Sequence, residues 1–177
     1  MLSVLDEAAE RMPYLTDIEV EQRIPVPGIN AWYARIIPKL RHLRVFKVTG
    51  HLEYNVFREL AELPSLQYIQ GVYGSRPEAG TQLPHDLPMG SFSTLSSLKL
   101  TVGLAKLGGV LSQFTGLQTL TLQTPCWESD HSLQKTRPAD LQAFLCQLAS
   151  TCDTIRNVSN VHYAGGAYRE GGSDHYF

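Results

Sequence analysis

The sequence predicts an α/β fold in which short helix–strand units stack into a curved solenoid, with a parallel strand ladder on the concave side and helices on the convex side. Three observations support this. A nine-residue pattern, with apolar residues at its first, fourth, seventh and ninth positions, recurs along the chain. The segments between copies carry apolar residues at three- or four-residue steps, as amphipathic helices do. The copies also follow one another at short intervals, which is typical of repeat proteins.

The final step of the pattern, from the seventh to the ninth position, is that of a strand. Residues two apart on a strand point to the same side, so these two positions should be buried and the sixth, eighth and tenth exposed. The apolar side chains at the first and fourth positions should pack on the core, at the end of the preceding helix and in the turn that follows it. One unit cannot bury its own apolar face, so the units must share a core. The six copies begin near residues 12, 40, 63, 92, 114 and 152.

Four copies are regular and two are not. The regular ones read MPYLTDIEV, LRHLRVFKV, FSTLSSLKL and FTGLQTLTL. In LPSLQYIQGV and CDTIRNVSNV the last apolar residue comes one position late, at Val72 and Val161, which predicts a bulge or the end of the regular ladder. Helices are expected between copies from the spacing of Trp32, Ile36 and Leu40, of Leu52, Val56 and Leu60, of Leu104, Leu107, Leu111 and Phe114, and of Leu141, Leu145 and Leu148.

A doubly wound α/β domain is the alternative fold, because it also alternates helices with parallel strands. Its central strands should be nearly continuous apolar runs, whereas the strands expected here are short and half polar. The segment GLAKLGGV contains glycines, but it has neither the Lys-Ser of a phosphate loop nor the glycine order of a dinucleotide-binding turn. The solenoid is therefore favoured.

The composition indicates one folded domain with a small net charge. The chain has 177 residues, 43% of them hydrophobic, and a formal charge of -2, so neither nucleic acid nor an anionic membrane is an expected partner. Three cysteines are too few for a disulfide scaffold, and the start MLSVLDEAAERM lacks the apolar core of a signal peptide. A cytoplasmic or nuclear location is expected. Residues 1–163 should form the repeat domain, and residues 164–177 a flexible glycine-rich tail.

The starts of the copies lie 28, 23, 29, 22 and 38 residues apart, and most of these steps fit leucine-rich repeats. With a helix before each copy and Cys152 in the first position of the last, the copies resemble the repeats of F-box-type proteins, particularly divergent fungal ones. The resemblance implies a protein-binding solenoid that recognises the substrates of a ubiquitin ligase. The opening segment LSVLDEAAERM does not read as the F-box that docks the ligase adaptor, so a ligase role is expected only if a longer chain supplies one.

A protein partner is expected on the concave face and on two insertions, residues 74–90 and 124–138, since long loops are often functional. Acidic residues at the first end of the face would attract a basic partner, although a solenoid end also needs a polar cap. The predicted partner-binding residues are Asp17, Glu19, Glu21, Lys47, Thr49, Tyr68, Gln70, Lys99, Thr101, Thr119, Thr121, Gln123 and Trp127.

The alternative function is that of a small α/β enzyme with a loop site around His85, Cys126 and His131. A thiol and an imidazole five residues apart in one loop lack an orienting third group and an oxyanion site, so a non-enzymatic protein is favoured. Cys146 and Cys152 lie too far apart around a helix to share one face, and both are expected in the core. No cofactor or metal is predicted.

Overall fold

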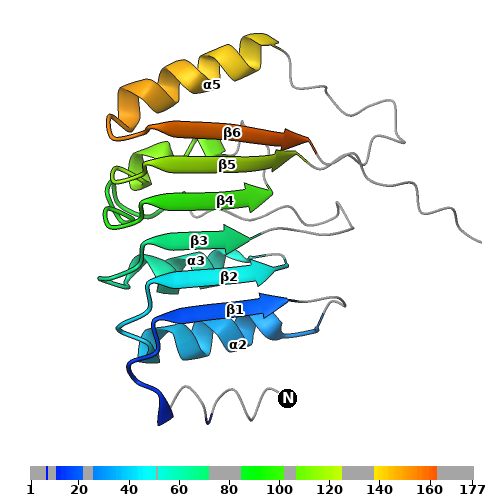
Figure 1. Cartoon of the computed structure of the whole chain (residues 1–177), viewed down its shortest axis with the longest axis vertical. Helices are drawn as coiled ribbons and strands as arrows, with labels where there is room; N and C mark the ends of the chain where they lie inside the picture. Colours follow the sequence, from blue (N-terminus) through cyan, green and yellow to red (C-terminus); the bar gives the residue numbers. More distant parts are fainter. Residues whose placement is uncertain are drawn as a thin grey trace, which may run out of the picture.

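The computed structural model describes residues 7, 11–21, 26–50, 52–71, 85–101, 107–124 and 138–162; the side chains of residues 123–124, 138–141 and 160–162 lie outside this description. It shows an α/β protein with one parallel sheet whose six strands follow chain order (Figure 1). Each copy of the pattern contributes one strand. The strands are β1 (Asp17–Glu21), β2 (Val45–Thr49), β3 (Tyr68–Gly71), β4 (Ser97–Thr101), β5 (Thr119–Thr124) and β6 (Asn157–His162).

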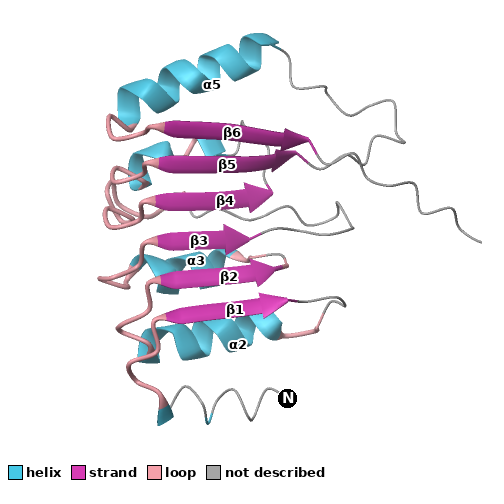
Figure 2. Ribbon diagram, viewed as in Figure 1, coloured by secondary structure: helices cyan, strands magenta, loops and turns pink. Residues whose placement is uncertain are grey.

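The described helices lie behind the sheet or beyond its last strand. In Figure 2, α2 and α3 lie behind the strands, and α5 lies beyond β6. No described helix therefore covers the face turned to the viewer. The helical elements are α2 (Ile29–Ile36), η1 (Ile37–Lys39), α3 (Tyr54–Ala61), η3 (Leu111–Gln113) and α5 (Pro138–Thr151).

The first helical segment shows how local sequence sets these elements. Gly28 stands before α2 with φ of 76°, a left-handed conformation that costs glycine little. Pro38 has no N–H to donate, so the helix tightens into the 3-10 turn η1. Trp32, Ile36 and Leu40 are all buried, as their spacing predicts.

One core runs between sheet and helices through all units. Along β2 the side chains alternate between half-buried and buried, and Phe46 and Val48 are the buried ones. Aromatic rings connect the layers: Tyr33 of α2 meets Phe46 edge-on, with ring centroids 5.3 Å apart. The other seventh- and ninth-position side chains that are buried in the middle strands are Ile69, Leu98, Leu100, Leu120 and Leu122.

Neighbouring units are joined by the same backbone contact before every strand. The Thr16 carbonyl accepts hydrogen bonds from the N–H groups of Arg44 and Val45, at 2.7 and 3.0 Å. Equivalent pairs of bonds recur at the carbonyls of Arg44, Gln67, Ser96 and Gln118. The strand register matches: sixth position pairs with sixth position from Asp17 to Asn157. The units therefore stack without a shift between them.

Most copies also close with the same turn, in which the fourth N–H donates to the first carbonyl. In the first copy the Leu15 N–H lies 3.0 Å from the Met12 oxygen. This bond fixes where the chain enters each strand. The other copies with this bond begin at Leu40, Phe92, Phe114 and Cys152.

Of the two alternatives predicted for the irregular copies, the end of the regular ladder is confirmed for β3, which stops at Gly71, and neither alternative is found in β6. Gly71, the ninth residue of the copy that begins at Leu63, is the last residue of β3 and pairs with Val48 and Leu100 in unbroken register. A Cβ atom on Gly71 would lie 2.7 Å from Cδ1 of Leu52, so the leucine fills the space that a side chain would take. In β6 the register continues without a bulge to His162.

The ends of the stack depart from the predicted burial. Met12 and Val158, in apolar positions of the first and last copies, are 50% and 43% exposed, because an end unit has a neighbour on one side only. In α5 the buried stripe runs through Phe144 and Leu148, whereas Leu145 is 40% exposed. The prediction that Leu145 faces the core is therefore wrong.

The strand order bears on the alternative fold as well. A doubly wound sheet contains a reversal of strand order, and this sheet runs from β1 to β6 without one. Of the helices in the described ranges, none is long and apolar enough to cross a membrane.

Candidate functional site

The sheet face that no described helix covers, here called the open face, carries the sixth- and eighth-position side chains together with Glu21 and Thr49. These side chains are exposed on β1 and half-buried on β2 to β5, while those between them point to the core. Because the register is unshifted, equivalent positions form rows across the strands. The sixth- and eighth-position members are Asp17, Glu19, Val45, Lys47, Tyr68, Gln70, Ser97, Lys99, Thr119, Thr121, Asn157 and Ser159.

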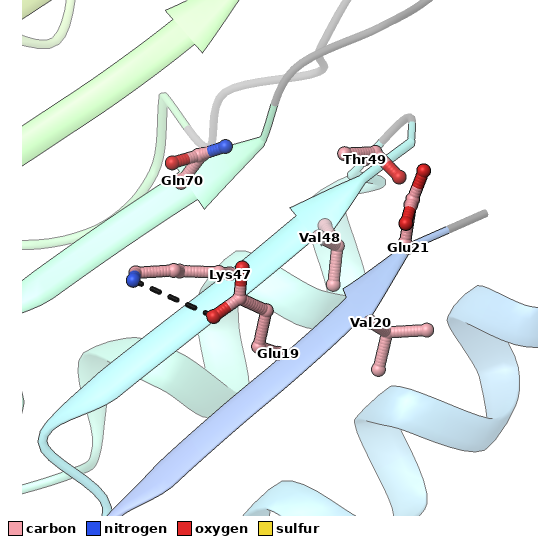
Figure 3. A pocket seen from close by; sticks show the side chains of 7 residues that line it. All are labelled: Glu19, Val20, Glu21, Lys47, Val48, Thr49 and Gln70. Atoms are coloured by element: carbon pink, nitrogen blue, oxygen red, sulfur yellow. Dashed lines mark ion pairs between the residues drawn. The ribbon is translucent and has the colours of Figure 1, made fainter.

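Four side chains at the β1 to β3 end hold one another in place. The Lys47 ammonium Nζ lies 3.6 Å from Oε2 of Glu19 (Figure 3). The same Nζ lies over the Tyr68 ring, 5.6 Å from its centroid. The Tyr68 hydroxyl donates a hydrogen bond of 2.8 Å to Oε1 of Gln70. The ion pair therefore joins β1 to β2, the cation–π contact joins β2 to β3, and the hydrogen bond joins two side chains of β3.

The electrostatics of this group contribute little to the stability of the fold. The Glu19 side chain is 75% exposed, and ion pairs in such surroundings contribute about 0–1 kcal/mol. Burial raises the pKa of Tyr68 above its usual value; nearby Lys47 opposes the shift and Glu19 adds to it. The phenol therefore stays protonated at neutral pH and keeps its proton for Gln70.

A hollow of about 170 Å³ lies beside this group, where β1, β2 and β3 end (Figure 3). Two carboxylates, one ammonium, one hydroxyl and one amide surround it, so it can receive a polar or charged group from outside. Its lining residues are Glu19, Val20, Glu21, Lys47, Val48, Thr49 and Gln70.

The remainder of the open face is mostly uncharged. Lys99 of β4 has the neutral residues Gln70 and Thr121 as its partners in register. Among the described residues it forms no ion pair. On β5 and β6 the Ser159 hydroxyl donates to Oγ1 of Thr121 at 3.0 Å. The face thus changes from acidic at β1 to uncharged hydroxyl and amide side chains on β5 and β6.

Most of the predicted partner-binding residues lie exposed or half-buried on this face. Thr101, the last residue of β4, pairs with Gln123 in register but is only 7% exposed, so little of it is accessible to a partner. Gln123 lies in β5 with its side chain outside the description, and Trp127 lies outside the described residues. The same holds for residues 74–84 and 125–137 of the two insertions.

Of the alternative enzyme site, only His85 is described, and it is exposed; Cys126 and His131 lie outside the described residues. The neighbour of His85, Asp86, accepts a hydrogen bond of 2.5 Å from the Tyr54 hydroxyl of α3. This bond raises the pKa of Tyr54 and lowers the pKa of Asp86. Asp86 therefore ties residues 85–90 to α3. In the described part of the chain, no group of His, Cys, Asp and Glu could hold a metal ion.

The two described cysteines differ in exposure. Cys152 is buried, and its thiol donates to the Phe114 carbonyl at 3.4 Å. Burial, and then nearby Asp153, raise the pKa of the Cys152 thiol. Cys146 is exposed on α5. The prediction of a core position is confirmed for Cys152 and wrong for Cys146.

The two thiols should react with an alkylating reagent at different rates. In the native protein at pH 8 we expect iodoacetamide to modify Cys146 within minutes and to leave Cys152 unmodified, because a buried thiol forms little thiolate. Peptide mass mapping of samples taken over time measures both sites. Unfolding in urea is the control and should make their rates similar. Equal rates in the native protein would contradict the burial of Cys152.

No family model matches the sequence, and no curated protein matches it. Function is therefore inferred from the open face.

Proposed function

We propose that this protein is a non-enzymatic protein-binding module, built as a leucine-rich-repeat solenoid whose open face is the concave, partner-binding surface. The observation that carries the proposal is the group of Glu19, Lys47, Tyr68 and Gln70, which presents fixed polar side chains on a sheet face without a described helix over it. Fixed side chains lose little conformational entropy when a partner binds.

The solenoid part of the proposal is supported by the sameness of the units. Each unit-to-unit junction uses one carbonyl to accept two N–H groups, and each strand pairs in the same register with the next. Stacked repeats behave in this way, because each one contacts only its neighbours. The same pair of hydrogen bonds occurs at the same place in successive copies of the sequence pattern. This agreement supports one repeated structural unit.

The protein-binding part is supported by the shape and chemistry of the face. Its rows extend across six strands, spaced about 4.8 Å apart. Tyr68, half-buried and held by Lys47 and Gln70, has the amphipathic ring that favours interface anchors. A surface of this breadth suits a protein segment better than a small molecule.

The resemblance to F-box-type proteins supports a narrower proposal. Under it, the module is the substrate-recognition part of a ubiquitin-ligase receptor in the cytoplasm or nucleus, and further chain supplies the F-box that reaches the adaptor. The captured partner would then be a protein marked for ubiquitination.

Affinity capture from a lysate of the source organism tests the open face. We expect the Glu19→Ala, Tyr68→Ala double variant to retain a specific partner at least about tenfold less well than the unchanged chain, because both side chains belong to the group that would anchor it. Quantitative mass spectrometry of the eluates measures retention, and circular dichroism checks that each variant is folded.

A matched control uses the same residue types away from the open face. Tyr14, 77% exposed in the turn before β1, and Glu62, exposed at the end of α3, are both replaced by alanine. This variant should retain the partner as the unchanged chain does. Equal retention by the open-face variant would remove the face from the proposed function.

A further inference from the structure

We infer that the middle of the open face binds an aspartate or glutamate carboxylate of the protein partner. Three hydrogen-bond donors in one row form the site: the amide of Gln70, the ammonium of Lys99 and the hydroxyl of Thr121. The inference rests on the proposed function and adds to it the chemistry of the partner.

The three side chains of this row are neighbours in register. Gln70 of β3 pairs with Lys99 of β4, and Lys99 pairs with Thr121 of β5. Each occupies the eighth position of its copy and is half-buried, so all three lie on the same side of the sheet. Adjacent strands are about 4.8 Å apart, which lets the long side chains of Gln70 and Lys99 reach one group together.

Hydrogen bonds to neighbouring side chains occupy the acceptors of this row and leave its donors. Oε1 of Gln70 accepts the Tyr68 hydroxyl at 2.8 Å, so the two amide hydrogens of Gln70 remain. Oγ1 of Thr121 accepts the Ser159 hydroxyl at 3.0 Å, so the Thr121 hydroxyl keeps its own hydrogen to donate. The Lys99 ammonium has donors only. None of these donors has an acceptor among the described residues, so the row is ready to bind one from a partner.

The charge of Lys99 is not balanced by its own part of the sheet. β3, β4 and β5 contain no aspartate or glutamate. The acidic residues of β1 are three strands away, and Lys47 lies between as the partner of Glu19. A half-buried ammonium is partly withdrawn from water, which strengthens a charge-assisted hydrogen bond to an anion that reaches it. The middle of the open face therefore favours an anionic group.

A carboxylate fits the row better than a phosphate does. An ionised carboxylate only accepts hydrogen bonds, and its two oxygens can bind the ammonium and a neighbouring donor at once. Its single charge matches the single charge of Lys99. A phosphate on a side chain carries nearly two charges at neutral pH, and the row offers one cation. Nucleic acid, with a phosphate at every nucleotide, is disfavoured for the same reason.

Nuclear magnetic resonance titration of the ¹⁵N-labelled full chain with two peptides tests the site. Both are short glycine–serine peptides, blocked at each end, that differ only in a central glutamate or glutamine. The side-chain amide signals of Gln70, assigned by their absence from a Gln70→Leu variant, report on the site directly. At neutral pH and low salt (about 50 mM), we expect the glutamate peptide to bind at least about fivefold more tightly than the glutamine peptide.

Removing the charge of Lys99 should remove this preference. With Lys99→Met, which keeps a long side chain, the two peptides should bind within about twofold of each other. Gln70→Glu should have the same effect, because a carboxylate at this position would pair with Lys99 itself. Backbone amide signals follow the titration in the variants at position 70.

Lys39→Met is the matched control, because it makes the same substitution away from the open face. Lys39 is exposed in η1, which directly follows α2 on the helical side of the sheet (Figure 2). This variant should keep the preference of at least about fivefold for the glutamate peptide. Circular dichroism checks that each variant is folded.

The absence of a preference in the unchanged chain, or a preference that survives in Lys99→Met, would overturn the inference. So would a phosphoserine peptide that binds at least about fivefold more tightly than the glutamate peptide, because it would assign the site to phosphate. The capture experiment separates these failures from a failure of the proposed function. If capture still depends on Glu19 and Tyr68, only the carboxylate site is wrong. If capture does not depend on them, the proposed function fails whatever the titration gives.

Discussion

Replacing Phe92 by alanine is expected to lower the free energy of unfolding by about 4 kcal/mol. Phe92 is 2% exposed and occupies the first position of its copy. Its ring stacks on that of Phe114, with centroids 4.9 Å apart and planes 12° apart. It also meets the Phe57 ring edge-on at 6.5 Å. The substitution removes contacts to two neighbouring units at once and leaves a cavity between them.

Urea unfolding followed by far-ultraviolet circular dichroism measures this loss. Met89→Ala is the matched control, because Met89 lies three residues away and is 78% exposed. We expect the control to change the free energy of unfolding by less than about 0.5 kcal/mol. Phe92→Leu should fall between the two, since it retains much of the apolar volume. A loss below about 1 kcal/mol for Phe92→Ala would contradict the tight packing of the three rings.

The strands and their register could be predicted from the sequence because two local signals agree. The step from seventh to ninth position marks each strand, and the turn from first to fourth position fixes where it begins. Since most of these turns are equivalent, the sixth residues of neighbouring copies pair with one another. Asp17 of β1 pairs with Val45 of β2, and Val45 pairs with Tyr68 of β3. A doubly wound arrangement would use the same local signals, so only the strand order separates the two folds.

The deviations arise where a residue lacks the neighbour that the pattern assumes. Met12 and Val158 satisfy the apolar pattern but belong to end units, so part of each side chain stays exposed. In α5, Leu145 and Phe144 are adjacent apolar residues, and periodicity alone does not decide which one faces the core. Gly71 shows the opposite case, because Leu52, nineteen residues earlier, fills a space that the pattern assigns to position 71.

The sequence predicts where the side chains of the candidate site lie, but not the contacts that they form with one another. The pattern places Glu19, Lys47 and Gln70 in one row, and the acidic residues of β1 predict a basic partner. The structure places the Lys47 ammonium against Glu19, so the chain itself supplies part of that positive charge. The bond between Tyr54 and Asp86 joins residues 32 apart and has no repeating counterpart among the described residues, so the repeat pattern does not predict it.

The turns before the strands make a second strong prediction, at Gly116. The third position of a copy lies against the turn of the copy before it. At Thr94 and Thr154 this position carries a hydroxyl that donates to the Leu66 and Leu117 carbonyls, at 2.9 and 2.8 Å. At Gly116 the backbones are too close for any side chain, since a Cβ atom there would lie 2.0 Å from the Ser93 carbonyl oxygen.

Gly116→Ala is therefore expected to lower the free energy of unfolding by about 3 kcal/mol, measured by the same urea titration, because backbone must move to admit the methyl group. Gly108→Ala is the matched control. Its Cβ would lie 3.1 Å from Oε1 of Gln147, the end of a flexible side chain, so the change should stay within about 1 kcal/mol. If the two variants are equally mild, the turns can shift relative to one another. A large difference would instead mean that the spacing of units is fixed at the turns, which in turn fixes the spacing of the charges on the open face.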